Sequence, residues 1–194
     1  MKLSYDATWQ DSVRLLRTHW DMVAALAGVF ILLPTLAQTL YVVPPSFTKF
    51  DAAAMQGFLA YFEANFPALL AVRLMTLIGT GALLALLVAP DRPTVGGAII
   101  RAARLLPSLL LVDILVQLIC ILGTIALIIP GLYLIARTAL SQTAMMAEGI
   151  ANPLRAIGRS FEMTTGLAWQ ILGLIIIVMT ASWIAISAST TVLG

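Results

Sequence analysis

Long apolar segments alternate along the chain with shorter segments in which apolar and charged residues repeat at helical spacing. At about 1.5 Å of rise per residue, roughly 20 residues are needed to cross a hydrocarbon core of about 30 Å. We expect five membrane spans, at residues 22–43, 67–89, 105–129, 131–147 and 167–189. The fourth is at the lower limit of length, so a re-entrant segment is the alternative to a full crossing.

Four shorter segments carry apolar residues on one helical face and charged residues on another. In the first, Trp9, Val13, Leu16 and Trp20 follow one another at spacings of four, three and four residues, which predicts one apolar face. Helices with tryptophan on such a face are typical of the membrane–water interface. We therefore expect surface helices at residues 4–20, 51–64, 94–104 and 152–165.

Capping and helix-breaking residues indicate where some of these elements begin and end. Thr94 and Asn152 are suited to cap the N-termini of helices, and Pro153 follows at a position where proline is tolerated. Pro130 and Gly131 predict a helix break between the third and fourth spans. Proline lacks a backbone donor there, and glycine permits a turn.

The composition assigns the chain to a class of protein. Of its 194 residues, 61% are hydrophobic and 10% are charged, and the mean hydropathy is +1.01, whereas soluble domains are about 25% charged. We expect an all-α, polytopic integral membrane protein with about five transmembrane helices and interfacial amphipathic helices. No basic run with interleaved aromatic residues occurs, so nucleic acid is not an expected partner.

The placement of charge predicts the orientation of the spans. With five crossings, most cationic residues between spans fall on one side of the membrane, against Lys49 alone on the other. The residues on the first side are Lys2, Arg14, Arg17, Arg92, Arg101, Arg104, Arg155 and Arg159. The positive-inside rule then places the N-terminus in the cytoplasm and the C-terminus outside. A re-entrant fourth segment would place Arg155 and Arg159 outside, against this bias.

Two arginines lie inside expected spans, Arg73 in the second and Arg137 in the fourth. A charge within a span is costly unless it is paired, hydrated or able to reach the interface. Both lie about 9 Å from the outer boundary by helix rise, and we interpret them as candidate contacts for a lipid headgroup or another anion. The alternative is that each reaches the interface separately or bonds to backbone carbonyls. The basic cytoplasmic surface comprises Arg14, Arg17, Arg101, Arg104, Arg155 and Arg159.

Few residues could support catalysis or metal binding. The single histidine, His19, lies at the expected membrane surface, so neither a histidine-based triad nor a metal cluster is expected around it. The single cysteine, Cys120, has no neighbouring base and excludes an internal disulfide framework. Asp113 and Gln117 alone do not make a proton relay. We therefore expect neither an enzyme nor a bound cofactor.

Residues 129–166 also resemble a known family. The resemblance is carried by Ile129, Pro130, Gly131, Tyr133, Arg137, Glu148, Gly149, Arg159, Ser160, Phe161 and Gly166. The stretch is similar to the membrane domain fused to some bacterial glycerophosphodiester phosphodiesterases and to the related YciC-like inner-membrane proteins. The resemblance implies a multi-pass domain of the bacterial inner membrane. The phosphodiesterase activity of the fused proteins belongs to a separate soluble domain, so none is implied for these residues.

These observations lead to three hypotheses for function. The first is a non-enzymatic scaffold or accessory subunit that binds anionic membrane lipids, another membrane protein or a second copy of the chain. The second is a small transporter or channel component for an anionic or amphiphilic solute, because broken helices are common in transporters. The third, which the resemblance implies, is a regulatory membrane domain for a separately encoded soluble enzyme.

Overall fold

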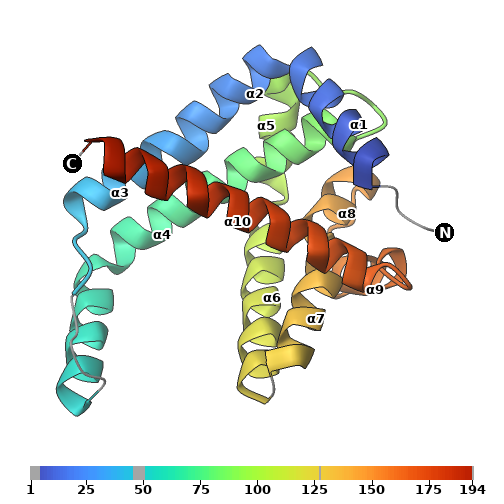
Figure 1. Ribbon diagram of the computed structural model, residues 1–194. Helices are drawn as coiled ribbons and strands as arrows, with labels where there is room; N and C mark the ends of the chain where they lie inside the picture. The colour runs from blue at the N-terminus through green and yellow to red at the C-terminus, as the bar shows by residue number, and fades with distance from the viewer. Residues whose placement is uncertain (1–4, 46–50, 127, 194) are drawn as a thin grey trace. The chain divides into compact units, whose positions relative to one another are not determined.

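The structure, a computed structural model, describes residues 5–45, 51–126 and 128–193 (Figure 1). Within these ranges every regular element is a helix, which confirms the expected all-α class. In the described part of the chain, three helical segments are long and apolar enough to cross a membrane, namely Trp20–Tyr41, Ala52–Val88 and Leu106–Ile125. A pair bent by 99°, Pro153–Met163 with Ala168–Thr180, could form a fourth span. The described part of the chain therefore has the helices of a multi-pass membrane protein.

The chain divides into two compact units, and helix α6 (Leu106–Ala126) runs through the boundary between them. The unit His19–Leu110 contains α2 (Trp20–Ala27), η1 (Gly28–Leu32), α3 (Leu33–Tyr41), α4 (Ala52–Val88) and α5 (Val95–Arg104). The other unit contains α1 (Tyr5–Thr18), α7 (Ile128–Thr138), α8 (Ser141–Glu148), α9 (Pro153–Met163) and α10 (Ala168–Leu193).

The expected surface helix at residues 4–20 is shorter in the structure. α1 ends at Thr18, and His19, with φ at −120°, separates it from α2. Trp20 therefore begins the next helix and is not part of α1 with Val13 and Leu16. The interruption of helical hydrogen bonding at His19 is not visible in the apolar spacing.

The first expected span, residues 22–43, corresponds to a continuous helical rod made of α2, η1 and α3. The π-helical turn η1 directly precedes Pro34, whose ring cannot donate the usual backbone hydrogen bond. The Thr35 hydroxyl donates to the carbonyl oxygens of Ile31 and Leu32. The wider turn and this hydroxyl let the rod continue through the proline.

α4 is a single helix of 37 residues, where the sequence predicted a surface helix at 51–64 and a separate span at 67–89. Pro67 lies inside the helix without ending it, and Figure 1 shows that α4 bends between its cyan N-terminal part and the remainder. An interior proline removes one backbone hydrogen bond and bends the axis, and such prolines are tolerated in membrane helices. At about 1.5 Å per residue α4 is roughly 55 Å long, which exceeds a hydrocarbon core of about 30 Å.

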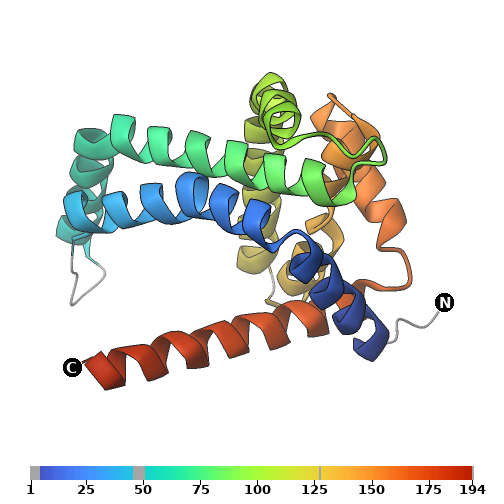
Figure 2. The ribbon, with the colours of Figure 1, turned by 90° about the horizontal axis from the view of Figure 1, so that it is seen from above.

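Small residues bring α4 close to its neighbours within this unit. α4 packs along α2, η1 and α3, as the blue and green ribbons of Figure 2 show. A Cβ atom on Gly79 would lie 2.5 Å from Cβ of Phe30. A Cβ atom on Gly81 would lie 3.1 Å from the side chains of Ala102 and Leu109. Glycine at these two positions thus permits close helix packing, as is common in membrane bundles.

Both predicted N-caps are present. The Thr94 hydroxyl oxygen accepts a hydrogen bond from the Gly97 N–H at 3.2 Å, at the start of α5. The Asn152 side-chain oxygen accepts from the N–H groups of Leu154 at 3.0 Å and Arg155 at 3.3 Å, at the start of α9. These bonds satisfy backbone donors that the first helical turn leaves without partners.

α6 and α7 approach each other closely at two glycines. A Cβ atom on Gly131 would lie 2.8 Å from backbone atoms of Thr124, and one on Gly123 would lie 3.2 Å from Cα of Gly131. Pro130 and Gly131 lie in the first turn of α7, which begins at Ile128. Proline is tolerated there because the first N–H groups of a helix have no intrahelical partner.

The expected fourth span, residues 131–147, is divided in the structure. α7 ends at Thr138 and α8 begins at Ser141, so no straight helix covers the segment. Arg137 lies in the last turn of α7 and contacts α9. The expected depth of Arg137, about 9 Å from the outer boundary, assumed a straight span with α9 on the opposite side of the membrane. The direct contact between Arg137 and α9 is incompatible with that combination of depth and position.

The helices of this unit pack in pairs. α8 packs on α9, and α10 packs on α7, with Ala136, Ala168 and Leu172 buried between α7 and α10. Gly149, at φ 66°, ends α8, and Gly166, at φ 78°, lies between α9 and α10. Both have left-handed backbone conformations that favour glycine. The two turns bring α9 and the start of α10 against the C-terminal end of α7.

Candidate functional site

Arg137 lies beside two aromatic rings at the end of α7. Its guanidinium carbon Cζ is 4.8 Å from the centre of the Phe161 ring and 5.8 Å from the centre of the Tyr133 ring. Tyr133 precedes Arg137 by about one turn of α7, and Phe161 comes from α9. At such distances an aromatic face attracts a cation by about 0.5–2 kcal/mol. The rings therefore hold the charge without neutralising it.

One hydrogen bond orients the guanidinium. Nη1 of Arg137 donates to the Thr165 hydroxyl oxygen at 3.1 Å, and this hydroxyl donates to the Phe161 carbonyl oxygen at 2.8 Å. Nε of Arg137 is buried and has no hydrogen-bond partner among the described residues. Within the same residues no carboxylate lies at ion-pair distance from Arg137. The described part of the chain thus supplies no counter-ion for this cation.

The backbone of Arg137 is fixed by hydroxyl groups of α9. Its carbonyl oxygen accepts hydrogen bonds from Ser160 Oγ at 2.7 Å and from Thr164 Oγ1 at 3.5 Å. Ser160 Oγ also accepts from the Leu140 N–H at 3.2 Å. The last carbonyls of a helix lack intrahelical partners, so these bonds stabilise the end of α7 and its junction with α8. Ser160 and Thr164 are both 0% exposed.

A further aromatic pair extends the site towards α10. The ring centres of Tyr133 and Trp169 are 6.1 Å apart, and the two residues are 36% and 63% exposed. We define the Arg137 cluster as Tyr133, Arg137, Phe161, Thr165 and Trp169. It joins a half-buried cation to an exposed apolar surface, a combination suited to an amphiphilic anion.

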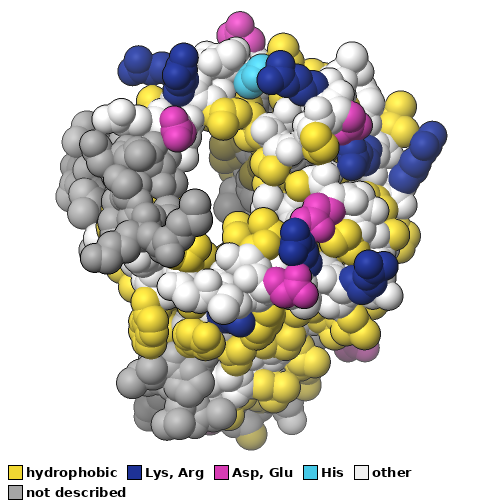
Figure 3. Space-filling model, turned by 90° about the vertical axis from the view of Figure 1, so that its right-hand side faces the viewer, with side chains coloured by type: hydrophobic (Ala, Val, Ile, Leu, Met, Phe, Trp, Pro, Cys, Tyr) yellow, Lys and Arg dark blue, Asp and Glu magenta, His cyan; other side chains and the backbone are white. Residues whose placement is uncertain are grey.

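Two arginines of the expected basic surface form ion pairs. Nε of Arg159 lies 2.8 Å from Glu148 Oε1, and its Nη1 lies 3.0 Å from Glu162 Oε2. The hydrogen bond with Glu148, followed by that with Glu162, raises the pKa of Arg159 above its usual value. Arg101 Nη1 lies 3.0 Å from Asp91 Oδ1. Figure 3 shows acidic and basic side chains in contact on one face of the molecule. Local pairing therefore reduces the positive charge that the sequence predicted for this surface.

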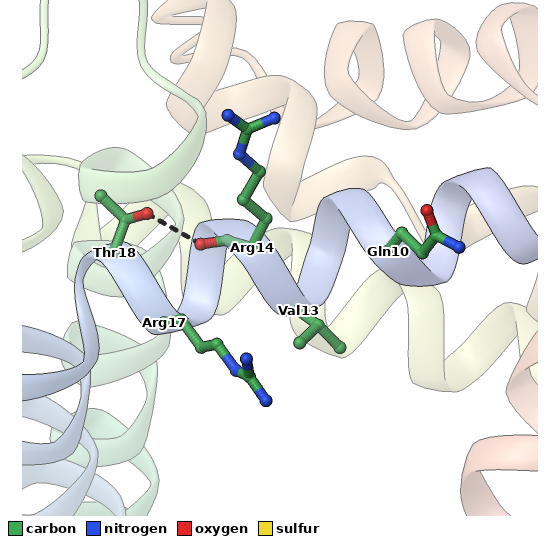
Figure 4. A pocket seen from close by; sticks show the side chains of 5 residues that line it. All are labelled: Gln10, Val13, Arg14, Arg17 and Thr18. Carbon is green, nitrogen blue, oxygen red and sulfur yellow. Dashed lines mark hydrogen bonds between the residues drawn. The ribbon is translucent and has the colours of Figure 1, made fainter.

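Arg14 and Arg17 do not converge on a common point. They line an open hollow on α1 together with Gln10, Val13 and Thr18. Figure 4 shows that the two arginine side chains leave the helix in opposite directions. The hydrogen bond drawn there runs from the Thr18 hydroxyl to the Arg14 carbonyl oxygen, at 2.8 Å. The hollow therefore does not direct two guanidinium groups at one anion.

The other predicted basic residues are not members of the Arg137 cluster. Arg104 at the end of α5 and Arg155 on α9 are exposed. Arg73 is exposed on α4 and has an interaction partner of its own. Arg73 and Arg137 belong to different units, so we treat them as separate candidate contacts.

The remaining polar groups of the apolar helices make local contacts. Asp113, which is buried, accepts a hydrogen bond from Gln117 Nε2 at 2.8 Å. Cys120 Sγ lies 4.0 Å from Thr138 Oγ1. Among the described residues, no group of three or more His, Cys, Asp or Glu side chains is arranged to hold a metal ion.

The sequence pointed to Arg137 but not to the residues around it. The spacing of Tyr133 and Arg137 was a usable signal, because residues four apart meet on a helix. Thr165 lies 28 positions further along the chain than Arg137, and no local periodicity connects the two. We compared the chain with protein-family models, curated proteins and solved structures, and none of them matched.

Proposed function

We propose that this protein is a non-enzymatic, multi-pass protein of the bacterial inner membrane that binds an anionic membrane lipid and acts as a scaffold or accessory subunit. The observation that carries the proposal is the environment of Arg137, a permanent cation without a counter-ion among the described residues. A charged side chain in an apolar membrane segment is unfavourable unless it is paired, hydrated or able to reach the interface. A bound anion offsets that cost, and an anionic headgroup is abundant at the place where this protein resides.

The chemistry of the cluster supports binding over catalysis. Its side chains are a guanidinium, a phenol, a hydroxyl, an indole and a phenyl ring, and this set contains no carboxylate, imidazole or thiol to act as a general base. The closest carboxylates on α8 and α9, Glu148 and Glu162, are bound to Arg159. A site of this composition can attract and orient an anion.

An exposed apolar stripe on α6 supports the scaffold part of the proposal. Residues at spacings of three and four along α6 are about half exposed or more, and these are Leu111, Ile114, Leu118, Ile121, Leu122 and Ile125. Such a stripe is typical of a helix that faces lipid or the helix of a partner subunit. The inner-membrane location is further supported by the resemblance of residues 129–166 to inner-membrane domains.

The test is native mass spectrometry of the protein extracted gently from its own membrane. We expect the wild-type protein to retain anionic lipid. The amount of lipid that stays bound should fall about tenfold or more in Arg137→Gln, because the substitution removes the charge but keeps much of the side-chain volume. Arg155→Gln is the matched control, because this exposed arginine of α9 lies outside the cluster. Equal lipid retention in all three proteins would contradict the proposal. Co-extraction of another membrane protein at fixed stoichiometry would specify an accessory subunit.

The junction of α7 and α8 favours a second candidate, a transporter component for an anionic amphiphile. Helices interrupted within the membrane are frequent at transport sites, and here the interruption follows Arg137 directly. Flux of an anionic solute into liposomes that disappears in a correctly assembled Arg137→Gln variant would favour transport over a scaffold.

A further inference from the structure

We propose that the Arg137 cluster takes a glycerophospholipid with a single net negative charge, with its phosphodiester at Arg137 and an acyl chain along the exposed face of α10. The inference rests on the proposed function, because it specifies which anion the cluster binds and how the ligand lies. Three properties of the cluster carry it: its charge, the donors left on the guanidinium, and the apolar strip that begins beside it.

The charge of the cluster matches one negative charge. Arg137 is the single permanently charged residue among the five side chains of the cluster. Arg159 of α9 is paired with Glu148 and Glu162. A phosphodiester carries one negative charge, whereas a phosphate monoester carries close to two at neutral pH. A dianion would therefore bring one uncompensated charge into a half-buried site, which is unfavourable.

The donors of Arg137 that are still available lie at the outer end of the guanidinium. Arginine has five N–H donors in a planar fork. One at Nη1 is used by Thr165, and the donor at Nε is buried beneath the aromatic contacts. The two Nη atoms can therefore present donors to the two non-ester oxygens of a phosphodiester, the geometry in which arginine binds phosphate most strongly.

An apolar strip runs from the cation along α10. Tyr133 contacts both the Arg137 guanidinium and Trp169. Ile176 lies seven residues beyond Trp169 and therefore within about 20° of the same face of α10, and it is 51% exposed. Leu172 is buried against α7 and borders the strip. Tyr133, Trp169 and Ile176 thus form an apolar strip that starts beside the guanidinium and along which an acyl chain can lie.

A free phosphate fits this arrangement less well than a lipid. Sites for free phosphate surround the ion with several donors, such as backbone N–H groups at a helix N-terminus. Arg137 lies in the last turn of α7, away from the free backbone N–H groups of a helix N-terminus, and one side of the cluster is apolar. The apolar strip adds favourable burial, about 25 cal/mol per Å², only for a ligand that has a chain.

The experiment measures ligand binding to the purified full chain in neutral detergent by native mass spectrometry. The probes are phosphatidylglycerol, phosphatidic acid, phosphatidylcholine and the water-soluble deacylated headgroup glycerophosphoglycerol. We expect phosphatidylglycerol to bind at least tenfold more tightly than phosphatidylcholine and glycerophosphoglycerol, and about threefold more tightly than phosphatidic acid. Arg137→Gln should remove the preference over phosphatidylcholine. Trp169→Ala and Ile176→Ala should weaken phosphatidylglycerol binding about three- to tenfold.

Val178→Ala is the matched control for the strip, because Val178 lies on the face of α10 opposite Trp169 and is 48% exposed. Equal binding of glycerophosphoglycerol and phosphatidylglycerol would overturn the acyl-chain part and leave anion binding intact. Tighter binding of phosphatidic acid would overturn the charge match. Loss of binding in Val178→Ala equal to that in Ile176→Ala would overturn the position of the chain. Binding of all lipids to the same degree, unchanged in Arg137→Gln, would remove both this inference and the proposed function.

Discussion

At the scale of single residues, Ser160 links the folding of this protein to its candidate site. Its hydroxyl donates to the Arg137 carbonyl oxygen and accepts from the Leu140 N–H, across the junction of α7 and α8. Both backbone groups belong to a part of the chain where helical hydrogen bonding stops. A buried backbone group without a partner costs about 1–3 kcal/mol. Ser160 therefore stabilises the interruption that places Arg137 at a helix end.

We expect Ser160→Ala to lower the free energy of unfolding by about 1–3 kcal/mol, because it removes these bonds from a fully buried position. Thermal or denaturant unfolding in detergent measures the change. Thr180→Ala is the control, since Thr180 on α10 is exposed and, among the described residues, its hydroxyl donates to the Ile176 carbonyl oxygen within its own helix. A loss of stability in Thr180→Ala as large as that in Ser160→Ala would argue against the bridging role.

The ends of the helices show what the local sequence can and cannot predict. The caps at Thr94 and Asn152 were predictable because the cap and the N–H groups it binds are two or three positions apart. The end of α7 was not, because no proline or glycine stands at residues 138–141 and the compensating hydroxyl belongs to another helix. A lone arginine in an apolar segment could be recognised, but its aromatic neighbours depend on tertiary packing.

At the scale of elements, close approach of helices depends on glycine. Gly131 brings α7 against Thr124 of α6, within a distance that no side chain allows. We expect Gly131→Ala to destabilise the protein by about 2–4 kcal/mol, because the new Cβ would meet backbone atoms at 2.8 Å and the two helices would have to separate. The measurement is the unfolding midpoint in detergent.

Gly158→Ala provides the matched control for this prediction. A Cβ atom there meets nothing within 4 Å, and Gly158 lies in the interior of α9, so alanine should stabilise the helix by about 0.5–1 kcal/mol. If Gly131→Ala lowers the stability and Gly158→Ala raises it, the loss at Gly131 comes from helix packing and not from helix propensity. Equal effects would show that the approach at Gly131 does not govern stability.

Helix lengths were predictable to the extent that the apolar pattern decides them, and Pro67 was misleading. Pro67 was expected to separate two elements, yet α4 continues through it. Pro130 lies in the first turn of α7, where proline is tolerated. In an apolar solvent the chain has no water to bind its free carbonyls, so helices bend at proline more readily than they end. The bend of α4 follows from that rule.

At the scale of the whole molecule, the number of crossings decides on which side of the membrane α9 lies. Among the described residues, three helical segments could cross a membrane, or four with the bent pair, whereas the charge distribution favours five crossings. The two descriptions differ at α7 and α8, which either cross the membrane together as a broken span or enter and leave on one side. The loop at Ala151 follows α8 and therefore reports which description holds.

We expect single cysteines at Arg92 and Ala151, introduced after Cys120→Ala, to react only with a membrane-permeant thiol reagent in intact cells. A cysteine at Pro45 should react also with an impermeant one. The reason is that a broken but complete fourth span keeps Arg155 and Arg159 on the cytoplasmic side with the other cations, as the positive-inside rule requires. Reaction of Ala151→Cys with the impermeant reagent would instead show a re-entrant segment. The Arg137 cluster would then face the outer leaflet, since α9 contacts Arg137 directly, and its lipid would come from that leaflet.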